Sequence, residues 1–178
     1  MSPEEFRKII LPEGRRLYAL AFRYLNNREE AEDMVQEVMM KLWAGRNEQV
    51  HYGNPAAWCT AVTRNSCIDI LRRRRRVRIE EISDTVIVPD TNTGMGDNAD
   101  NLEAVQMIGT IVSRMREPYR SAVILRDMEG YSYEETAEIL QTNINALRTL
   151  LSRARKSIRE EMERIYSYGT GKNKGTAQ

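Results

Sequence analysis

Residues 131–158 read YSYEETAEILQTNINALRTLLSRARKSI, and this stretch sets the structure of the second half of the chain. Ser132 and Glu135 form a capping box, in which each side chain binds a free backbone amide at the start of a short helix. The chain then turns, and Asn143 caps a longer helix. A short helix, a tight turn and a longer helix are the pattern of a helix-turn-helix, whose second helix enters the major groove of DNA.

The longer helix has an apolar side and a polar side, and the residue types on the polar side indicate what it binds. The apolar side consists of Ile144, Leu147, Leu151, Ala154 and Ile158. The polar side carries amide, hydroxyl and cationic groups rather than the Glu and Lys pairs of a merely solvated helix, and these are Asn145, Arg148, Thr149, Ser152, Arg153, Arg155 and Lys156. Such groups read base edges and bind phosphates, so the pattern predicts DNA binding; an exposed basic face without a ligand is the alternative.

Two further helices are predicted before this motif. One carries an apolar stripe formed by Leu102, Val105, Ile108, Val112 and Met115. Pro118 is expected to open the next helix, which carries Val123 and Leu125 on its apolar side. That helix is expected to stop at Gly130, a residue that tolerates the left-handed conformation after a helix.

The net charge of +1 conceals three blocks of different charge. Residues 1–78 carry fifteen bases and ten acids, residues 79–103 carry seven acids and no base, and residues 104–178 carry twelve bases and nine acids. The acidic block also contains Pro89, Gly94 and Gly96 and has no helical period. It is interpreted as a flexible linker at 79–101 between two small domains.

The first half of the chain predicts three helices around one apolar seam. A helical hairpin covers residues 17–42 and breaks at Asn26-Asn27. Asn54 is expected to cap a third long helix, with Pro55 in its first position. The inner side of this helix is predicted to consist of Trp58, Val62, Ile68 and Leu71. Its exposed side carries Arg64, Asn65 and Asp69, and five consecutive arginines, Arg72 to Arg76, follow these residues along the helix. A polar face followed by a dense cationic end suits contact with a nucleic-acid backbone, although a solvated face is the plainer interpretation.

Composition excludes several classes of protein. The start of the chain has acids where a signal peptide needs bases, and no stretch approaches the roughly 18 apolar residues of a spanning helix, so a cytoplasmic protein without membrane insertion is expected. Cys59 and Cys67 stand too far apart along one helix for a disulfide, and with a single histidine they predict no metal site. His51 has no evident nucleophile partner, so no catalytic residues, no cofactor and no enzyme are expected.

Two motifs together resemble a known family. Residues 31–38 (AEDMVQEV), with Leu42-Trp43, Trp58, Arg64-Asn65 and residues 68–73 (IDILRR), resemble region 2 of a bacterial sigma factor. Residues 131–140 (YSYEETAEIL), with Leu147-Arg148 and residues 153–155 (RAR), are similar to region 4. Both motifs in order, joined by a short acidic linker, resemble an extracytoplasmic-function sigma factor of the sigma-70 family.

The resemblance implies partners and roles for named residues. Asp33, Gln36 and Glu37 match the motif that binds the largest subunit of core RNA polymerase. Asn65, Asp69, Arg72 and Arg73, with the loop 47–54, match the surface that recognises and melts the -10 element. On the last helix Arg148, Thr149 and Ser152 match the readers of the -35 element, with Asn145 beside them and Arg153 and Lys156 better placed for phosphates. An anti-sigma factor is a further expected partner, and in the family the linker is similar to a nucleic-acid mimic, with a plain tether as the alternative.

The sequence departs from the family pattern around the turn of the helix-turn-helix. Gln141 replaces the usual glycine, Thr142 and Thr136 replace apolar residues, Ala146 replaces a frequent threonine, and Leu150 stands where a basic residue is common. A differently set turn and a missing phosphate contact are therefore expected, and the family's base contacts do not transfer one by one.

The fold class that follows is all-α, with two small helical domains joined by an acidic flexible linker. The region 2-like domain is expected at 1–78, the linker at 79–101, the region 4-like helix-turn-helix domain at 102–166 and a disordered tail at 167–178. The expected function is promoter recognition, DNA melting and transcription initiation with RNA polymerase. A stand-alone dimeric helix-turn-helix regulator and a helical protein-binding adaptor remain the alternatives.

Overall fold

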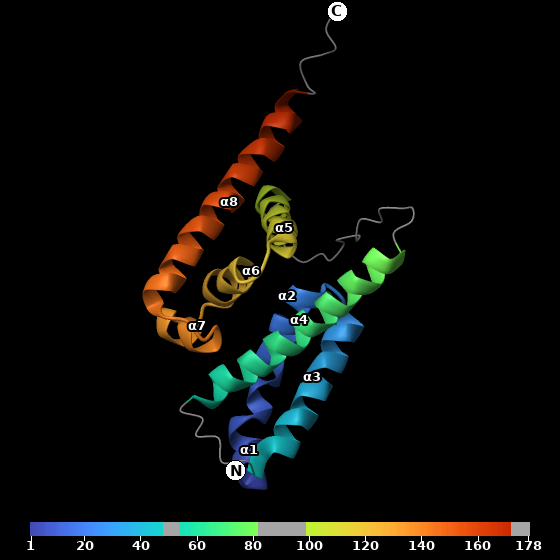
Figure 1. Ribbon diagram of the computed structural model, residues 1–178, viewed down its shortest axis with the longest axis vertical. Coiled ribbons are helices and arrows are strands. Elements are labelled where there is room, and N and C mark those ends of the chain that lie inside the picture. Colours follow the sequence, from blue (N-terminus) through green and yellow to red (C-terminus); the bar gives the residue numbers. More distant parts are fainter. Residues whose placement is uncertain (48–53, 82–98, 172–178) are drawn as a thin grey trace, which may run out of the picture. The chain divides into compact units, whose positions relative to one another are not determined.

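A computed structural model describes residues 1–47, 54–81 and 99–171, and every regular element in these ranges is helical. The chain divides into two compact units near residue 90 (Figure 1). The all-α, two-domain prediction is therefore confirmed. Each unit is described by itself below.

The first unit is a bundle of three helices with a short helix at its start. Its elements are α1 (Pro3–Ile9), the 3-10 turn η1 (Leu11–Glu13), α2 (Gly14–Leu25), α3 (Arg28–Ala44), the 3-10 turn η2 (Gly45–Asn47) and α4 (Pro55–Glu81). Helices α2, α3 and α4 pack against one another (Figure 1). The hairpin and the third helix predicted from the sequence are these three elements.

Asparagines set the ends of these helices. Asn26 ends α2 in the left-handed conformation, with φ 51°, and the Asn27 side chain accepts a hydrogen bond from the Glu30 amide at 3.1 Å to begin α3. The Asn54 side chain likewise accepts from the amide of Ala57 at 3.1 Å and begins α4. The short-range capping signals in the sequence therefore place these helices correctly.

Helix α1 was not predicted, although its own capping box is visible in the sequence. The Ser2 hydroxyl accepts from the Glu5 amide at 3.2 Å, and the Ser2 amide donates to the Glu5 carboxylate at 2.7 Å. Phe6 is buried, and its ring lies edge-on to the ring of Trp43 with 5.1 Å between centroids. This aromatic pair holds α1 against the end of α3.

The inner side of α4 differs from the prediction. Trp58, Val62 and Leu71 are only half-buried, and of the four predicted inner residues Ile68 alone is buried. The buried residues are instead mostly small, namely Ala57, Cys59, Thr60, Thr63, Cys67 and Ile68. Small side chains allow α4 to approach its neighbours closely. The two threonines satisfy their hydroxyls within the helix, donating to the carbonyls of Ala56 and Cys59 at 2.8 and 2.9 Å, respectively.

The second unit is built around one long helix. Its elements are α5 (Ala99–Arg114), α6 (Tyr119–Val123), the π-helical turn η3 (Ile124–Met128), α7 (Tyr133–Ile139) and α8 (Ile144–Gly171). Helices α5 and α6 both pack on α8 (Figure 1). Leu147, Leu151 and Ala154 of α8 are buried, as the apolar stripe predicted, whereas Ile144 and Ile158 of the same stripe are half-buried.

The stripe predicted on α5 is partly wrong. Val105 is 62% exposed, whereas Val112 is buried as predicted, together with Ile111, which the predicted stripe did not include. The C-terminal half of α5 is therefore the part that contributes to the core. A uniform apolar stripe in the sequence does not distinguish a covered half of a helix from an uncovered one.

The helix after Pro118 also differs in detail from the prediction. Pro118 is the residue before the first turn, and α6 continues into the π-helical turn η3, where the Glu129 amide donates to the carbonyl of Ile124 at 2.9 Å. Gly130 then has φ 75°, the left-handed conformation predicted for it. The helix ends where expected, but its last turn is wider than an α-helical one.

The helix-turn-helix itself is confirmed. The Ser132 amide donates to the Glu135 carboxylate at 2.8 Å, and the Glu135 amide donates to the Ser132 hydroxyl at 3.0 Å. Asn143 caps α8 by accepting from the amide of Ala146 at 2.8 Å. Gln141 has φ 52°, so the turn keeps a left-handed residue although the sequence has no glycine there.

Three helices extend past the boundaries that the sequence suggested for the domains. Helix α4 continues to Glu81 and α5 begins at Ala99, so both reach into the linker predicted at 79–101. Helix α8 continues to Gly171, beyond the predicted start of the tail at residue 167. The remainder of the predicted linker and tail, 82–98 and 172–178, lies outside the described residues.

Candidate protein- and nucleic-acid-binding surfaces

The first candidate surface is the polar face of α3. Asp33, Gln36 and Glu37 are all exposed, one turn apart on the same side of the helix. The opposite side carries the buried residues Ala31, Met34, Val38 and Leu42. Because packing fixes the apolar side, the polar face points to solvent in a defined direction, and the structure brings together the three residues that the sequence proposed.

This face continues into apolar residues that the sequence analysis missed. Met40 is 66% exposed and follows Gln36 and Glu37 by one turn, and Trp43 is 39% exposed one turn later. The Trp43 ring is covered in part by Arg46, whose guanidinium carbon lies 3.9 Å from the ring centroid. An exposed methionine beside acidic and amide groups is typical of a protein-binding surface. Its spacing from Gln36 and Glu37 could have identified it.

The second candidate surface is the polar face of α4. Asn65, Asp69, Arg72 and Arg73 are exposed and recur at helical spacing, as predicted. The Arg72 guanidinium lies 3.8 Å from the Asp69 carboxylate, and Arg73 donates to the carbonyl of Asp69 at 3.4 Å. These contacts are long and lie on the exposed side of the helix, so they cost little to break and leave both guanidiniums available to a ligand.

One of the remaining arginines in the run from Arg72 to Arg76 stabilises the bundle instead of facing solvent alone. Arg74 forms an ion pair with Glu30 of α3, which ties the end of α4 to the bundle. Arg75 and Arg76 are exposed. The run therefore combines one anchor with a cationic surface. His51 and the loop that precedes α4 lie outside the described residues.

The third candidate surface is the solvent side of α8. All six predicted residues are exposed, and they are Asn145, Arg148, Thr149, Ser152, Arg153 and Lys156. Their position follows from burial of the opposite side of the helix. Arg153 stands at the edge of the face, because five residues at 100° each place it about 140° around the helix from Arg148.

Arg155, which the sequence grouped with the DNA-binding side chains, has a partner within the protein. Its guanidinium donates two hydrogen bonds to Asp127 of η3, at 2.9 Å from Nε and 2.6 Å from the terminal nitrogen. This contact, with a smaller contribution from the Tyr133 hydroxyl, raises the pKa of Arg155 above its ordinary value, against an opposing effect of burial. Arg155 therefore fastens α8 to η3 rather than projecting freely.

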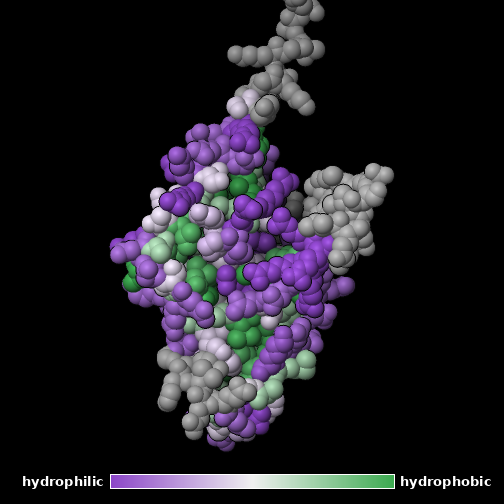
Figure 2. Space-filling model, in the orientation of Figure 1, coloured by the Kyte–Doolittle hydropathy of each residue, from purple (hydrophilic) through white to green (hydrophobic). Residues whose placement is uncertain are grey.

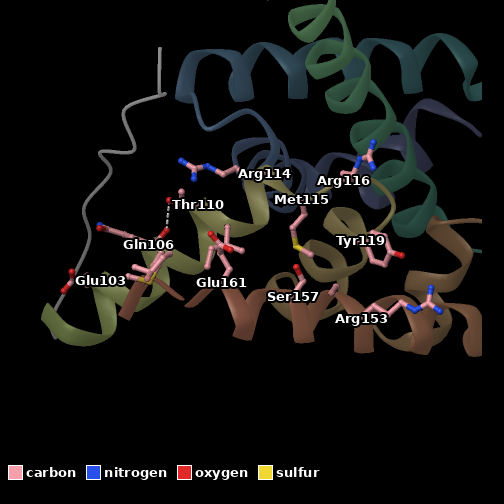
Figure 3. A pocket seen from close by; sticks show the side chains of 14 residues that line it. Glu103, Gln106, Thr110, Arg114, Met115, Arg116, Tyr119, Arg153, Ser157 and Glu161 are labelled. Atoms are coloured by element: carbon pink, nitrogen blue, oxygen red, sulfur yellow. Dashed lines mark hydrogen bonds between the residues drawn. The ribbon is translucent and has the colours of Figure 1, made fainter. Parts of the chain in front are cut away.

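A groove of about 720 Å³ runs along α5 and α8 in the second unit (Figure 3). Its apolar lining includes Met107, Ile111 and Ile165, with Arg114 and Arg153 among its polar residues. Figure 3 shows the side chain of Met115, the residue that follows α5, extending toward Ser157 of α8. Apolar patches also interrupt the otherwise polar surface in the space-filling view (Figure 2). The groove is lined by two segments, 103–119 and 153–165, that are more than thirty positions apart, so no local sequence motif predicts it.

The cysteines belong to the core. Cys59 and Cys67 are both buried, and no disulfide joins them. Burial, with a smaller effect of Glu13, raises the pKa of the Cys59 thiol from 9.0 to about 12. Among the described residues no cluster of histidine, cysteine and carboxylate side chains could hold a metal ion, and no helix there is long and apolar enough to cross a membrane.

Two family models match the two units in order. Residues 9–77 match Sigma-70 region 2 and residues 106–158 match Sigma-70, region 4. The chain belongs to the sigma-70 family. The matches cover α2, α3 and α4 in one unit and most of α5 to α8 in the other, and thus all three candidate surfaces of this sigma factor.

Individual relatives place this sigma factor in the extracytoplasmic-function group. It is 31% identical over 149 residues to the ECF RNA polymerase sigma factor SigE of Mycolicibacterium smegmatis, covering 82% of this chain and 56% of that one. It is 28% identical to the RNA polymerase sigma factor SigV of Bacillus subtilis, covering 82% and 83% of the two chains. The present sequence therefore spans little more than half the length of the first of these relatives.

The fold is shared with a solved sigma factor. The sigma factor RpoE in complex with the anti-sigma factor NepR, from Bartonella quintana, superposes with a TM-score of 0.71 at 25% identity. The match covers 90% of this chain and 98% of that one. The resemblance found in the sequence is thus confirmed at the level of family and fold.

Proposed function

We propose that this sigma factor binds core RNA polymerase and directs promoter recognition, DNA melting and transcription initiation. The observation that carries the proposal is the presence, in one chain, of a region 2 unit and a region 4 unit whose polar helix faces are all turned to solvent. A regulatory role of this kind needs no catalytic group, so the protein is proposed not to be an enzyme. It would act in the cytoplasm, where the polymerase works.

The polar face of α3 is the proposed site for the polymerase. Asp33, Gln36 and Glu37 supply acceptors and an amide, and Met40 adds apolar surface one turn further on. Glu37 pairs with Lys41 at 2.7 Å, but this exposed pair costs little to break. A mixed polar and apolar patch on one rigid helix suits a protein partner better than it suits DNA.

The two DNA surfaces are proposed to divide the promoter between them. Asn65, Asp69, Arg72 and Arg73 on α4 would contact the -10 element, where an amide and a carboxylate can bind base edges and the arginines can bind phosphates. On α8, Asn145, Arg148, Thr149 and Ser152 would read the -35 element in the major groove. Arg153 and Lys156 would contact its phosphates.

An anti-sigma factor is proposed as a further partner. The solved structure of the RpoE sigma factor is a complex with the anti-sigma factor NepR. The groove along α5 and α8 provides this chain with apolar surface beyond what its own core requires.

The proposal is tested by titrating labelled protein with core polymerase. Replacing Asp33 and Gln36 together by Ala should weaken binding by about 30-fold or more, because truncation of even one hot-spot residue of an interface costs about 2 kcal/mol or more. The matched control is Glu163→Ala, which removes an exposed acid from α8 in the other unit. Helicity should be unchanged in both variants. Equal affinity of the double variant and the unaltered protein would refute the assignment of α3.

The two alternatives make different predictions. A dimeric helix-turn-helix regulator binds palindromic DNA without polymerase, so a footprint of the free protein on a palindrome would favour it. A helical adaptor would bind no DNA with or without polymerase. The proposed sigma factor needs the polymerase to engage promoter DNA.

A further inference from the structure

Tyr133, the first residue of α7, is the meeting point of three arginines. The guanidinium carbon of Arg126 lies 4.7 Å from the centroid of its ring, and that of Arg148 lies 5.6 Å from it. Both distances are within the roughly 6 Å range of a cation–π contact. The Tyr133 hydroxyl also interacts with Arg155, so the ring stands between the turn before the helix-turn-helix and the start of its second helix.

The ring is held in place by a rigid local frame. Tyr133 follows directly on the capping box of Ser132 and Glu135, which fixes the first turn of α7. Arg126 is fixed in turn, because it donates to the carbonyl of Tyr131 at 3.2 Å. Arg148, in contrast, is exposed on α8. The contact therefore joins one long, exposed side chain to a fixed aromatic face.

We propose that Tyr133 is a positioning residue that sets the direction of Arg148 and thereby determines base preference in the -35 element. This inference rests on the proposed function, in which Arg148 reads a base. An arginine side chain loses considerable rotamer entropy when it forms a bidentate contact with guanine. A ring that already restricts Arg148 in the free protein lowers that cost for the correct base.

The electrostatics of the cluster support the same role. Arg126 and Arg148 are like charges within 6 Å of the same ring, and the electron-rich face of the tyrosine attracts both. The charge of Arg155 is balanced by Asp127. Without the aromatic face, the repulsion between these two guanidiniums would no longer be offset by attraction to the ring.

Three substitutions of Tyr133 separate the ring from the hydroxyl and from simple volume. Tyr133→Phe keeps the ring and should leave base preference unchanged. Tyr133→Leu and Tyr133→Met both remove the aromatic face; the two replacements have nearly the same volume, and the unbranched Met reaches further along the space that the ring occupied. Both should reduce discrimination at the base read by Arg148 by about two- to fivefold, the factor that corresponds to an exposed cation–π contact. The assay is transcription by reconstituted holoenzyme on promoters varied singly across the -35 element.

A double-mutant comparison distinguishes positioning from a structural effect. In an Arg148→Ala background, Tyr133→Met should change base preference no further, because the side chain that it positions is gone. Tyr119→Leu, at another half-buried tyrosine of the same unit, is the matched control and should not alter base preference. Thermal unfolding identifies any variant that is not folded, and base preference is then scored on the folded one.

The outcomes also separate this inference from the proposed function. If Arg148→Ala changes base preference and neither Tyr133→Leu nor Tyr133→Met does, the positioning role is refuted and the DNA-reading role stands. If Arg148→Ala itself leaves base preference unchanged, the proposed base-reading role of Arg148 is refuted, and the positioning role of Tyr133 is refuted with it. If Tyr133→Phe relaxes base preference as much as Tyr133→Met, the hydroxyl rather than the ring acts, and the inference is wrong.

Discussion

Replacing Arg148 and Arg153 separately by Ala should divide base reading from phosphate binding on α8. Arg148 is the fifth residue of this helix, in the part that lies deepest in a major groove. Arg153 stands five residues further along, about 7.5 Å along the axis and about 140° around it. The two guanidiniums therefore cannot make the same kind of contact with one duplex.

The two substitutions are expected to change different properties, namely base preference and the salt dependence of affinity. A bidentate contact from arginine to guanine contributes roughly 1–3 kcal/mol of discrimination, so Arg148→Ala should relax the choice of base at one or two positions by about five- to 150-fold. Loss of one phosphate contact should weaken every sequence alike, so Arg153→Ala should reduce the slope of log affinity against log salt by about one unit.

The assay is holoenzyme binding and transcription on promoters varied singly across the -35 element, repeated at several salt concentrations. Arg159→Ala is the control, because Arg159 is exposed on the same helix about 16 Å further along its axis than Arg148. It should change neither property. A uniform loss of activity in Arg148→Ala, with base preference intact, would show that Arg148 binds phosphate and that the proposed orientation of α8 on DNA is wrong.

Three further predictions concern stability and are checked by urea unfolding. Thr136→Val should stabilise the second unit by about 1 kcal/mol, because the buried Thr136 hydroxyl has no hydrogen-bond partner among the described residues; an unchanged or lower midpoint would contradict this. Gln141→Gly should stabilise it by about 0.5–1 kcal/mol, since Gln141 has φ 52° and glycine adopts this conformation without a steric cost; a loss of stability would show that the turn is unstrained. Because burial raises the pKa of Cys59, its neutral thiol stabilises the fold below pH 9, and this contribution to the free energy of unfolding is lost as pH rises from about 9 to about 12. Cys59→Ala should remove this part of the pH dependence of stability. A variant with the same pH profile as the unaltered protein would contradict this prediction.

The parts of the fold that could be predicted from the sequence depend on neighbouring residues. Asn27, Asn143 and the capping box at Ser132 act over three positions, so they mark the starts of helices without knowledge of the tertiary fold. The inner side of α4 could not be found in the same way. Apolar residues occur on several sides of that helix, and close approach of its neighbours favoured the small residues Cys59 and Thr63 over Trp58.

The same distinction applies to the candidate surfaces. The exposed faces of α3, α4 and α8 are the complement of their apolar sides, so their residues could be identified from periodicity. The partner of Arg155 could not, because Asp127 lies 28 residues away and the pair exists only once the second unit is folded. The groove along α5 and α8 and the contact of Arg148 with Tyr133 are tertiary for the same reason.

The central claim, that this chain directs initiation by RNA polymerase through two DNA-binding units, is tested most directly by mapping start sites. Core polymerase is reconstituted with the protein on a library of promoter fragments, and the 5′ ends of the transcripts are sequenced. The account predicts start sites that share two sequence elements at a constant spacing, with both elements required. Transcripts that start no more specifically than with core polymerase alone would contradict it.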